Sequence, residues 1–507
     1  MKTKSISKKK ASILNLLFNY ANTIFAIING LVLVPLYLKY FSIGTYGSFL
    51  SSGNIVAMLG LLEGGTSMVL TQRLSASFAK RDYQTFSKLI GSGLFISFCL
   101  TSALVIIGLL FFPFISGWVK AEPKEYTGIQ YSFLLSAIGA GLSISFSNIS
   151  AAFQAWLRVK TSGMINLISI PLGILTTLLG LKFGLGVVSI PLGILVKSLF
   201  GVISLLIVLF KTLVKERYPK ISIDKTDCVN LVRTTFPVFG SMVAKSVVTN
   251  SQLLIITNVI DPVSSAVFFM TGRIFNLCES LLAPIGSSIF ASISQMVAEG
   301  DGQKIKTNLI KVFVIFSGFS VLILTMSLGV NKLFVGIWVG MDKFGGEALS
   351  ALLCLTMFIS TRFKFLEFIL FALGIFGRTV FYDLICGAIR VLLIFSLIRY
   401  LGFIAIPIAE LIPTVLILGY FLNKLMISKI QLNRNESIKF VFAGGLALAI
   451  GFTVSLVGSI YYKYELKMEW LVLYVVVLFI VNSLLVILFT EEFRDLGSKL
   501  IRSKQSD

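Results

Sequence analysis

Long apolar segments constrain the fold of this 507-residue chain more than any other feature. About 20 apolar residues in an α-helix cross the hydrocarbon core of a bilayer, and fourteen segments reach or approach that length. Hydrophobic residues make up 56% of the chain and charged residues 13%, a composition typical of membrane proteins. The sequence therefore predicts an all-α polytopic membrane protein with about 14 transmembrane helices. The segments run approximately over 13–38, 46–70, 88–112, 128–152, 161–181, 184–210, 234–257, 265–292, 308–331, 347–373, 379–400, 402–423, 439–461 and 470–490.

Positive charge is distributed unevenly over the loops, and alternate loops hold most of the lysines and arginines. Because such loops stay on the cytoplasmic side, we expect both termini in the cytoplasm. The basic start of the chain precedes an apolar run that is too long for a cleaved secretory signal. Membrane topology thus explains most of the formal net charge of +21. No loop is long enough to build a soluble basic face, so nucleic acid is not an expected partner.

The chain also repeats itself in two halves. Three short matches occur in the same order, at nearly the same spacing and at equivalent topological places. They predict two six-helix lobes, residues 1–222 and 223–430, followed by two additional helices and a cytoplasmic tail in residues 431–507. Because six is an even number, both lobes insert the same way up, and such a parallel pseudo-repeat puts a cargo site between the lobes near the bilayer midplane. The matched pairs are Ala79–Gln84 with Ala298–Gln303, Phe114–Val119 with Phe334–Val339, and Gly186–Pro191 with Gly402–Pro407.

Four basic side chains lie in the middle of apolar segments. A lysine or arginine at the centre of a membrane helix costs roughly 2.5–3.5 kcal/mol of insertion free energy, so these positions need an explanation. Each lies roughly 12–17 Å deep in a core about 30 Å thick, near the midplane. One explanation is a cationic central cavity that binds an anionic cargo, and the alternative is buried ion pairs that lock helices together. The four are Lys197, Lys245, Arg273 and Arg390, and the carboxylates that could pair with them are Glu63, Glu279, Asp383 and Glu410.

Further polar residues in the apolar segments are expected at the same cavity. Arg362 and Lys364 extend the substrate-binding cations, unless they snorkel from a helix end. Asn276 and a row of asparagines in the first segment predict a polar lumen, with hydrogen bonding between helices as the alternative. Glu63, a lone intramembrane carboxylate, is a candidate either for H⁺ or Na⁺ coupling or for the counter-ion of a cavity cation. The asparagine row consists of Asn15, Asn19, Asn22 and Asn29.

The usual chemical groups of enzymes and metal sites are missing from the sequence. The chain contains no histidine, which is the commonest general base and the commonest metal ligand. Its five cysteines are scattered singly, and no pair has the spacing of a metal or redox site. We therefore expect no catalytic residues, no metal, no cofactor and no enzymatic activity.

Local patterns in the first and the tenth to twelfth segments are shared with one group of transporters. The patterns are Pro35–Leu38 with Gly44–Gly47, Leu59–Gly65, the acidic and basic loop around Asp82, Leu373 with Gly374, and Gly402 with Pro407. With these residues the chain resembles the multidrug/oligosaccharidyl-lipid/polysaccharide exporter superfamily, and within it the O-antigen (Wzx-type) flippases. The resemblance covers residues from about 13 to 430.

The resemblance implies a flippase of lipopolysaccharide biosynthesis. Such a protein moves an undecaprenyl-pyrophosphate-linked oligosaccharide, such as an O-antigen unit, from the cytoplasmic to the periplasmic leaflet of the bacterial inner membrane by alternating access. Its implied partners are this lipid-linked oligosaccharide, an H⁺ or Na⁺ counter-ion, membrane lipids and polysaccharide polymerase machinery.

The first segment departs from two other branches of the superfamily. The drug and Na⁺ antiporter branch usually carries an acidic residue there, and the lipid II flippase branch a basic and acidic signature, whereas residues 13–38 contain neither. Two alternative functions stay open. A cation-coupled multidrug exporter of the same fold would have a lumen dominated by carboxylates. A membrane-embedded glycan polymerase or ligase would need a long periplasmic loop with catalytic residues.

Overall fold

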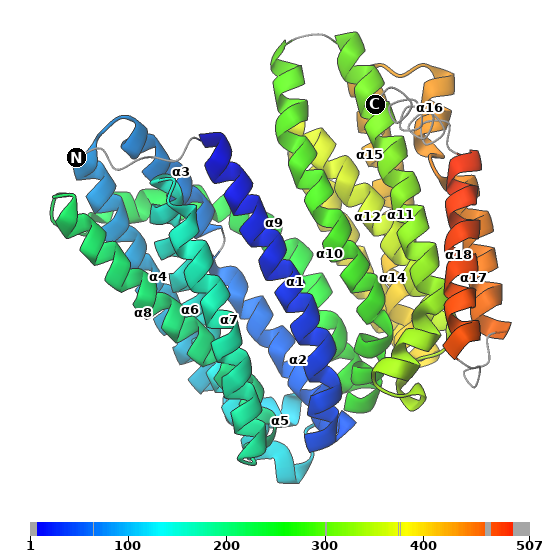
Figure 1. Cartoon of the computed structure of the whole chain (residues 1–507), viewed down its shortest axis with the longest axis horizontal. Helices are drawn as coiled ribbons and strands as arrows, with labels where there is room; N and C mark the ends of the chain where they lie inside the picture. The colour runs from blue at the N-terminus through cyan, green and yellow to red at the C-terminus, as the bar shows by residue number, and fades with distance from the viewer. Residues whose placement is uncertain are drawn as a thin grey trace. The chain divides into compact units, whose positions relative to one another are not determined.

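The computed structural model of the protein is built of α-helices (Figure 1). It describes the backbone of residues 8–63, 65–299, 302–373, 375, 377–461 and 468–489, and most of their side chains, the main exceptions being 8–16, 236–249 and 286–305. No strand occurs among these residues. The chain divides into two compact units, Met1–Ala266 (unit 1) and Val267–Asp507 (unit 2). The predicted all-α polytopic fold is confirmed.

Unit 1 is organised around one helix, α6, which packs most extensively against four others. Its neighbours are α2, α3, α4 and α8, and α7 in turn packs along α8 and α1. The bounds in this unit are α1 Lys8–Tyr40, α2 Ile43–Gly60, α3 Thr66–Ala79, α4 Tyr83–Phe111, α5 Ile115–Trp118, α6 Tyr126–Ala155, α7 Val159–Lys182, α8 Ser189–Lys215 and α9 Lys225–Val259.

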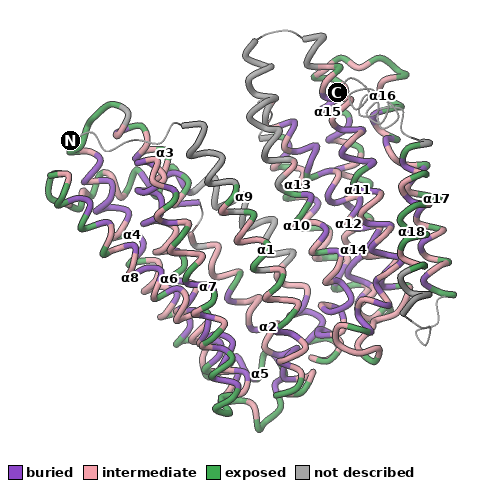
Figure 2. Tube along the Cα trace, viewed as in Figure 1, coloured by how far each residue is buried: buried purple, intermediate pink, exposed green. Residues whose placement is uncertain are grey.

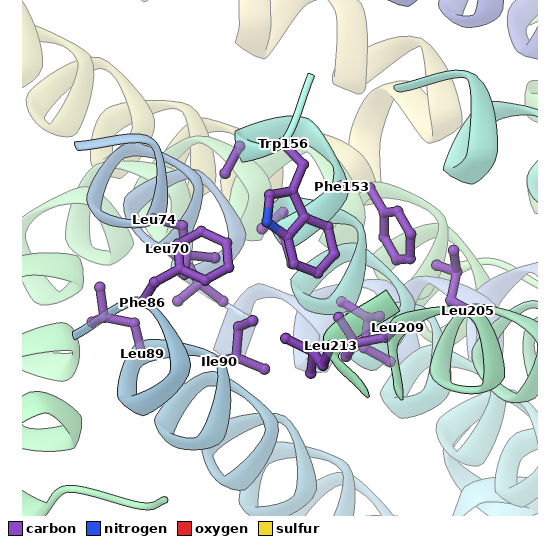
Figure 3. Close-up of a cluster of buried hydrophobic side chains, with 14 of the residues drawn as sticks. Leu70, Leu74, Phe86, Leu89, Ile90, Phe153, Trp156, Leu205, Leu209 and Leu213 are labelled. Carbon is purple, nitrogen blue, oxygen red and sulfur yellow. The ribbon is translucent and has the colours of Figure 1, made fainter. Parts of the chain in front are cut away.

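An aromatic and aliphatic core fills one end of unit 1 (Figure 3). The rings of Phe86 and Trp156 lie 5.4 Å apart between centroids, and Trp156 also meets Phe153 edge-on at 5.6 Å. The indole N–H of Trp156 donates to the hydroxyl of Tyr218 at 3.0 Å, so the polar edge of the ring is satisfied inside the core. This contact also ties the segment after α8 to the body of the unit.

Unit 2 contains α10 to α18. The bounds are α10 Pro262–Glu299, which begins in unit 1, α11 Gly302–Trp338, α12 Glu347–Ala372, α13 Gly377–Leu401, α14 Ala405–Pro413, α15 Gly419–Ile430, α16 Arg434–Val441, α17 Gly445–Tyr461 and α18 Met468–Phe489. The last two helices pack on α11. The buried Asn482 of α18 contributes to this packing, since it accepts from Thr325 of α11 at 2.8 Å and donates to Ser455 of α17 at 3.3 Å.

The fourteen expected segments lie mainly on helical residues, and three of them are interrupted. One of the three is 439–461, which contains a turn at 442–444 between α16 and α17. The segment 46–70 ends its first helix at Gly60 and passes through a 3₁₀ turn at Leu61–Glu63, and α3 then begins after Gly65, which has φ +82°. A glycine is needed there because a side chain disfavours this backbone conformation. The segment 402–423 contains a π-helical turn at Thr414–Leu418, directly after Pro413.

The length and composition of the helices agree with membrane spans. Ten helical stretches among the described residues are long and apolar enough to cross a bilayer, and one of them, Arg378–Ile430, covers two of the expected segments. Exposed positions occur along the whole length of many helices (Figure 2), and they include many leucine, isoleucine and phenylalanine side chains. Such surfaces are expected where helices face lipid.

The helix α9, which the internal repeat assigns to the second lobe, makes contacts within unit 1. The repeat assigns it to the second lobe, 223–430, but its contacts are with α2, α3 and α4, and the units divide after Ala266. Ser51 donates to the carbonyl of Leu253 at 3.2 Å, and Arg73 donates to the carbonyl of Asn230 at 3.1 Å. These bonds hold α9 to unit 1 near both of its ends. The division into two repeated lobes stays a prediction.

Candidate functional site

A cavity of about 570 Å³ lies within unit 1, between α1, α6, α7 and α8. Its volume falls in the roughly 300–1,000 Å³ of small-molecule binding sites. The lining combines apolar side chains with amides, hydroxyls and one ammonium group. The polar lining residues are Asn22, Thr23, Asn29, Tyr37, Ser143, Asn166, Thr177, Lys197 and Ser198, and the others are Leu33, Ile170, Gly173, Ile174, Ile190, Gly193 and Ile194.

The lysine of this cavity is placed by a close crossing of α7 and α8. A Cβ atom added at Gly193 would lie 2.0 Å from Thr177 Oγ1 and 2.5 Å from the carbonyl oxygen of Gly173. In the reverse direction, a Cβ atom at Gly173 would lie 2.8 Å from the carbonyl oxygen of Gly193 and 3.0 Å from Lys197 Cβ. Small residues allow two membrane helices to approach in this way. Lys197 follows Gly193 by one helical turn, so the crossing positions its side chain at the cavity.

A duplicated peptide underlies the crossing, and sequence reasoning missed it. The heptapeptide Ser-Ile-Pro-Leu-Gly-Ile-Leu occurs at Ser169–Leu175 in α7 and again at Ser189–Leu195 in α8. In both copies the first isoleucine, the glycine and the second isoleucine line the cavity. Thr177 follows Gly173 by four residues, and Lys197 follows Gly193 by four residues. The two copies therefore place a hydroxyl and an ammonium group at equivalent positions. The seven-residue identity could have found this pair of helices.

Lys197 has no partner for its charge in the described part of the chain. Its ammonium group makes no hydrogen bond or ion pair with the described residues, and no described residue that lines the cavity is acidic. The side chain is only partly exposed. An unpaired ammonium in a partly enclosed polar cavity favours the binding of an anionic group, because field lines are poorly screened there.

Two amide side chains of α1 belong to the lining of the same cavity. Asn22 and Asn29 are seven residues apart, which puts them on one helix face two turns from each other. The Oδ1 atoms of both are buried and have no hydrogen-bond partner among the residues that the structure describes. Across the cavity, the hydroxyls of Ser143 and Ser198 lie 2.9 Å apart. The side chains of Asn15 and Asn19, which we expected on the same polar face, lie outside the described residues.

Asn166 completes the polar lining from α7, and it was not among the residues expected there. The signal available in the sequence was weak, since a single amide in an otherwise apolar helix does not show which way it points. The cavity therefore presents three amides, several hydroxyls and one cation.

In unit 2, Arg390 is held by an ion pair. Its guanidinium lies 3.4 Å from the carboxylate of Glu410 and donates to the hydroxyl of Thr414 at 3.0 Å. The same Glu410 oxygen accepts from Ser360 at 3.1 Å. Thr414 is the first residue of the π-helical turn, so this network joins α12, α13 and α14 where the last of these changes its helical period. The contacts agree with the ion-pair alternative for Arg390, and its role in substrate binding stays a prediction.

Arg362 binds the end of another helix. Its guanidinium donates to the carbonyl oxygens of Phe440 at 2.8 Å and Val441 at 2.5 Å, which are the last residues of α16, and it lies 5.1 Å from the ring centroid of Phe313. The last carbonyls of a helix lack intrahelical partners and carry the negative end of its dipole, so a buried cation is stabilised there. This arrangement gives Arg362 a structural role that the sequence did not indicate.

The other expected cations and Glu63 have the following surroundings. Lys364 forms an ion pair with Glu279, and Arg273 lies 5.8 Å from the ring centroid of Phe269. Glu63, in the 3₁₀ turn of the second segment, accepts a hydrogen bond from Ser67 at 2.5 Å. The roles of these residues stay predictions. Asn276 is exposed, and the side chain of Lys245 lies outside the described residues.

The four central cations are divided between the two units. Lys197 and Lys245 belong to unit 1, whereas Arg273 and Arg390 belong to unit 2. Within each unit the structure brings Lys197 together with Asn22, and Arg390 together with Glu410. A single layer formed by all four cations stays a prediction.

Comparison with solved structures relates the whole chain to known transporters, although no protein-family model and no curated protein sequence matches it. The lipid II flippase MurJ in an inward closed conformation has a TM-score of 0.68 at 15% identity, covering 96% of this chain and 99% of that one. An inward-facing multidrug resistance MATE transporter of the MOP superfamily has a TM-score of 0.65 at 13% identity, covering 81% and 95%. A third match, at TM-score 0.53 and 15% identity, covering 83% and 94%, is a MOP superfamily transporter from Pyrococcus furiosus described as having a binding pocket of reverse polarity. The chain therefore has the fold of the MOP superfamily transporters.

Proposed function

We propose that this protein is a flippase that moves an undecaprenyl-pyrophosphate-linked oligosaccharide, such as an O-antigen unit, from the cytoplasmic to the periplasmic leaflet of the inner membrane. The observation that carries the proposal is the Lys197 ammonium, which has no partner among the described residues and faces a cavity of amides and hydroxyls. A lipid-linked oligosaccharide combines anionic groups with a polar glycan, and both parts match this lining.

The solved relatives support the same conclusion by analogy of fold. One of them is a lipid II flippase, which also acts on a lipid-linked substrate. MATE structures of inward-facing and outward-facing conformations share the fold as well. We infer that this chain also works by alternating access, with Lys245, Arg273 and Arg390 as further cation contacts and Glu63 as the residue that couples H⁺ or Na⁺.

The charge of the cavity favours the flippase over the multidrug exporter. Export of cationic drugs needs carboxylates in the lumen, and the described lining of the unit 1 cavity has one cation and no carboxylate. The flippase is therefore the function that the cavity supports best.

The experiment is a transbilayer assay on the full chain in proteoliposomes. Vesicles contain a synthetic polyprenyl-pyrophosphate-linked oligosaccharide in the inner leaflet, and a membrane-impermeant lectin detects its arrival outside. We expect faster arrival with the wild type than with empty vesicles and a reduced rate with Lys197→Met. The matched control is Lys211→Met, which removes an exposed lysine from the same helix, α8.

Two results would overturn the proposal. The first is a wild-type rate equal to that of empty vesicles. The second is export of a cationic dye by the same vesicles with no movement of the lipid-linked sugar, since that result belongs to the multidrug exporter.

A further inference from the structure

Three polar side chains of unit 2 lie together at membrane depth and at the surface of that unit. Asn276 of α10 is exposed, and Glu279, one turn later, forms an ion pair with Lys364 of α12. The side chain of Lys364 is 56% exposed and that of Glu279 is 25% exposed. Counted from the starts of α10 and α12, Glu279 and Lys364 each lie roughly 25 Å along their helices, inside a hydrocarbon core about 30 Å thick.

The exposure at this place is specific to polar residues. Between Leu349 and Leu370 of α12, Lys364 is the one exposed residue. Next to it, α10 and α12 share a buried apolar cluster that includes Phe275 and Phe358. Lipid on this face would leave an unpaired amide and an exposed ammonium group in hydrocarbon, which is costly for both. We therefore expect the face to meet water or cargo.

The three side chains have unused capacity both to donate and to accept hydrogen bonds. Asn276 makes no hydrogen bond with the described residues, so its amide offers two donors and one acceptor. Oε1 of Glu279 accepts from Lys364, which leaves Oε2 as an acceptor and two N–H groups of the ammonium as donors. Because Asn276 and the ion pair lie at the surface of the unit, a ligand can reach these groups without a rearrangement.

The charge balance of the site disfavours ionic ligands. Glu279 and Lys364 cancel each other, so an anion is repelled by the carboxylate and a cation by the ammonium. Arg273, on the same side of α10, lies over the ring of Phe269, which is one turn closer to the start of the helix and so on the far side of Arg273 from Asn276. The site therefore favours a neutral ligand whose groups both donate and accept.

Neutral sugar residues meet these requirements. A sugar hydroxyl both donates and accepts hydrogen bonds, and an acetamido group does so as well. Phe368, which is partly exposed one turn after Lys364, can pack against the C–H face of a sugar ring. From these observations, and resting on the proposed function, we propose that Asn276, Glu279 and Lys364 form a binding site for neutral sugar residues of the lipid-linked oligosaccharide. Glu279 accepts hydrogen bonds from sugar hydroxyls, and Lys364 and Asn276 donate to hydroxyl or acetamido oxygens.

The test measures binding of a small probe to the full chain in lipid nanodiscs by saturation-transfer NMR. The probe is methyl β-N-acetylglucosaminide, which is neutral, with inorganic pyrophosphate as a competitor. We expect the sugar to bind to the wild type and pyrophosphate not to displace it. Asn276→Ala should weaken sugar binding several-fold, and Glu279→Gln about tenfold or more, as expected for loss of a neutral and of a charged hydrogen bond.

Two controls separate sugar recognition from folding. Ser280→Ala is matched to Asn276→Ala, because Ser280 lies one turn later on the same side of α10 but donates its hydroxyl to the carbonyl of Leu277 at 2.7 Å, and it should leave sugar binding unchanged. Lys197→Met should also leave it unchanged, because a neutral sugar does not need that cation. Asn276→Ala should melt at the wild-type temperature, since its removal breaks no hydrogen bond with the described residues.

Three results would overturn the inference. They are a folded wild type that gives no saturation transfer to the sugar, displacement of the sugar by pyrophosphate, and wild-type affinity in Asn276→Ala. In the last case, a lower melting temperature of Glu279→Gln would assign the ion pair to the packing of α10 against α12 alone.

The outcome is distinguishable from failure of the proposed function. Wild-type vesicles that move the lipid-linked oligosaccharide, combined with wild-type sugar affinity in Asn276→Ala, contradict the sugar site and leave the flippase standing. Sugar binding that depends on Asn276 and Glu279, in a protein that moves no lipid-linked oligosaccharide, contradicts the flippase and supports the sugar site.

Discussion

The crossing of α7 and α8 makes Gly193→Ala an informative substitution. The new Cβ atom would lie 2.0 Å from Thr177 Oγ1 and 2.5 Å from the carbonyl oxygen of Gly173, far short of the 3.4 Å at which ordinary contact begins. The threonine hydroxyl can rotate away, but the carbonyl belongs to the backbone of α7, so the two helices must separate. Overpacking of this kind typically costs about 1–3 kcal/mol of the free energy of unfolding. For a unit of this size the melting temperature should fall by about 2–10 °C.

The measurement is thermal unfolding of the purified variants in detergent, together with the vesicle assay. The matched control is Gly53→Ala in α2, where an added Cβ atom meets nothing within 4 Å. An alanine there should leave the melting temperature unchanged or raise it slightly, because a glycine in a helix loses more conformational entropy on folding. Gly193→Ala should also reduce transport, since it displaces Lys197 from the cavity. Wild-type stability and transport in Gly193→Ala would refute the reasoning about the crossing.

Three further predictions concern the other polar contacts. Arg362→Met should lower the melting temperature, because it removes the bonds to the last carbonyls of α16; an unchanged melting temperature would contradict the capping role. Glu410→Gln and Arg390→Met should each lower the free energy of unfolding by up to about 3–5 kcal/mol. In a double-mutant cycle measured by thermal unfolding, the double variant should lose much less than the sum of the two single losses, and additive losses would refute the ion pair. Hydrogen bonds from the backbone N–H groups of Asp227 and Thr226 hold the pKa of Asp224 below its usual value. The ionised Asp224 side chain therefore stabilises the fold at pH values above the usual pKa of an aspartate, and this stabilisation is lost as the pH falls through the lowered pKa. The melting temperature of Asp224→Ala should therefore be below that of the wild type near pH 7 and approach it below about pH 4, and a constant difference down to low pH would contradict this assignment.

The helices could be predicted from the sequence because hydrophobic length alone determines a membrane span. Every expected segment lies mainly on helical residues, and the break after Gly60 falls in the Leu59–Gly65 stretch of segment 46–70, where two glycines follow Glu63. The contacts of α9 with α2, α3 and α4 could not be predicted in this way. A repeat records which helices correspond to each other, whereas packing depends on which faces meet, and the bonds from Ser51 and Arg73 are invisible in a linear pattern.

The cavity was predicted only in part, for a similar physical reason. Lys197 and the asparagines of α1 stood out because polar groups are costly in lipid. Arg390 stood out in the same way and Arg362 less strongly, yet one of them pairs with Glu410 and the other binds carbonyl oxygens. The cost of burial identifies a position that needs a partner, but whether a side chain or a ligand is that partner depends on the rotation of each helix about its axis, which one sequence does not specify.

The two identical heptapeptides place equivalent side chains at two different heights along the pair of helices α7 and α8. Thr177 and Lys197 occupy matching positions on opposite sides of the glycine crossing, one on the side of the connecting loop and the other away from it. The double variant Thr177→Lys, Lys197→Thr keeps the composition and the crossing and moves the positive charge by roughly 10 Å along the hairpin. Comparing the transport rate of this double variant with that of the wild type shows whether the position of the charge along the hairpin matters, separately from its presence.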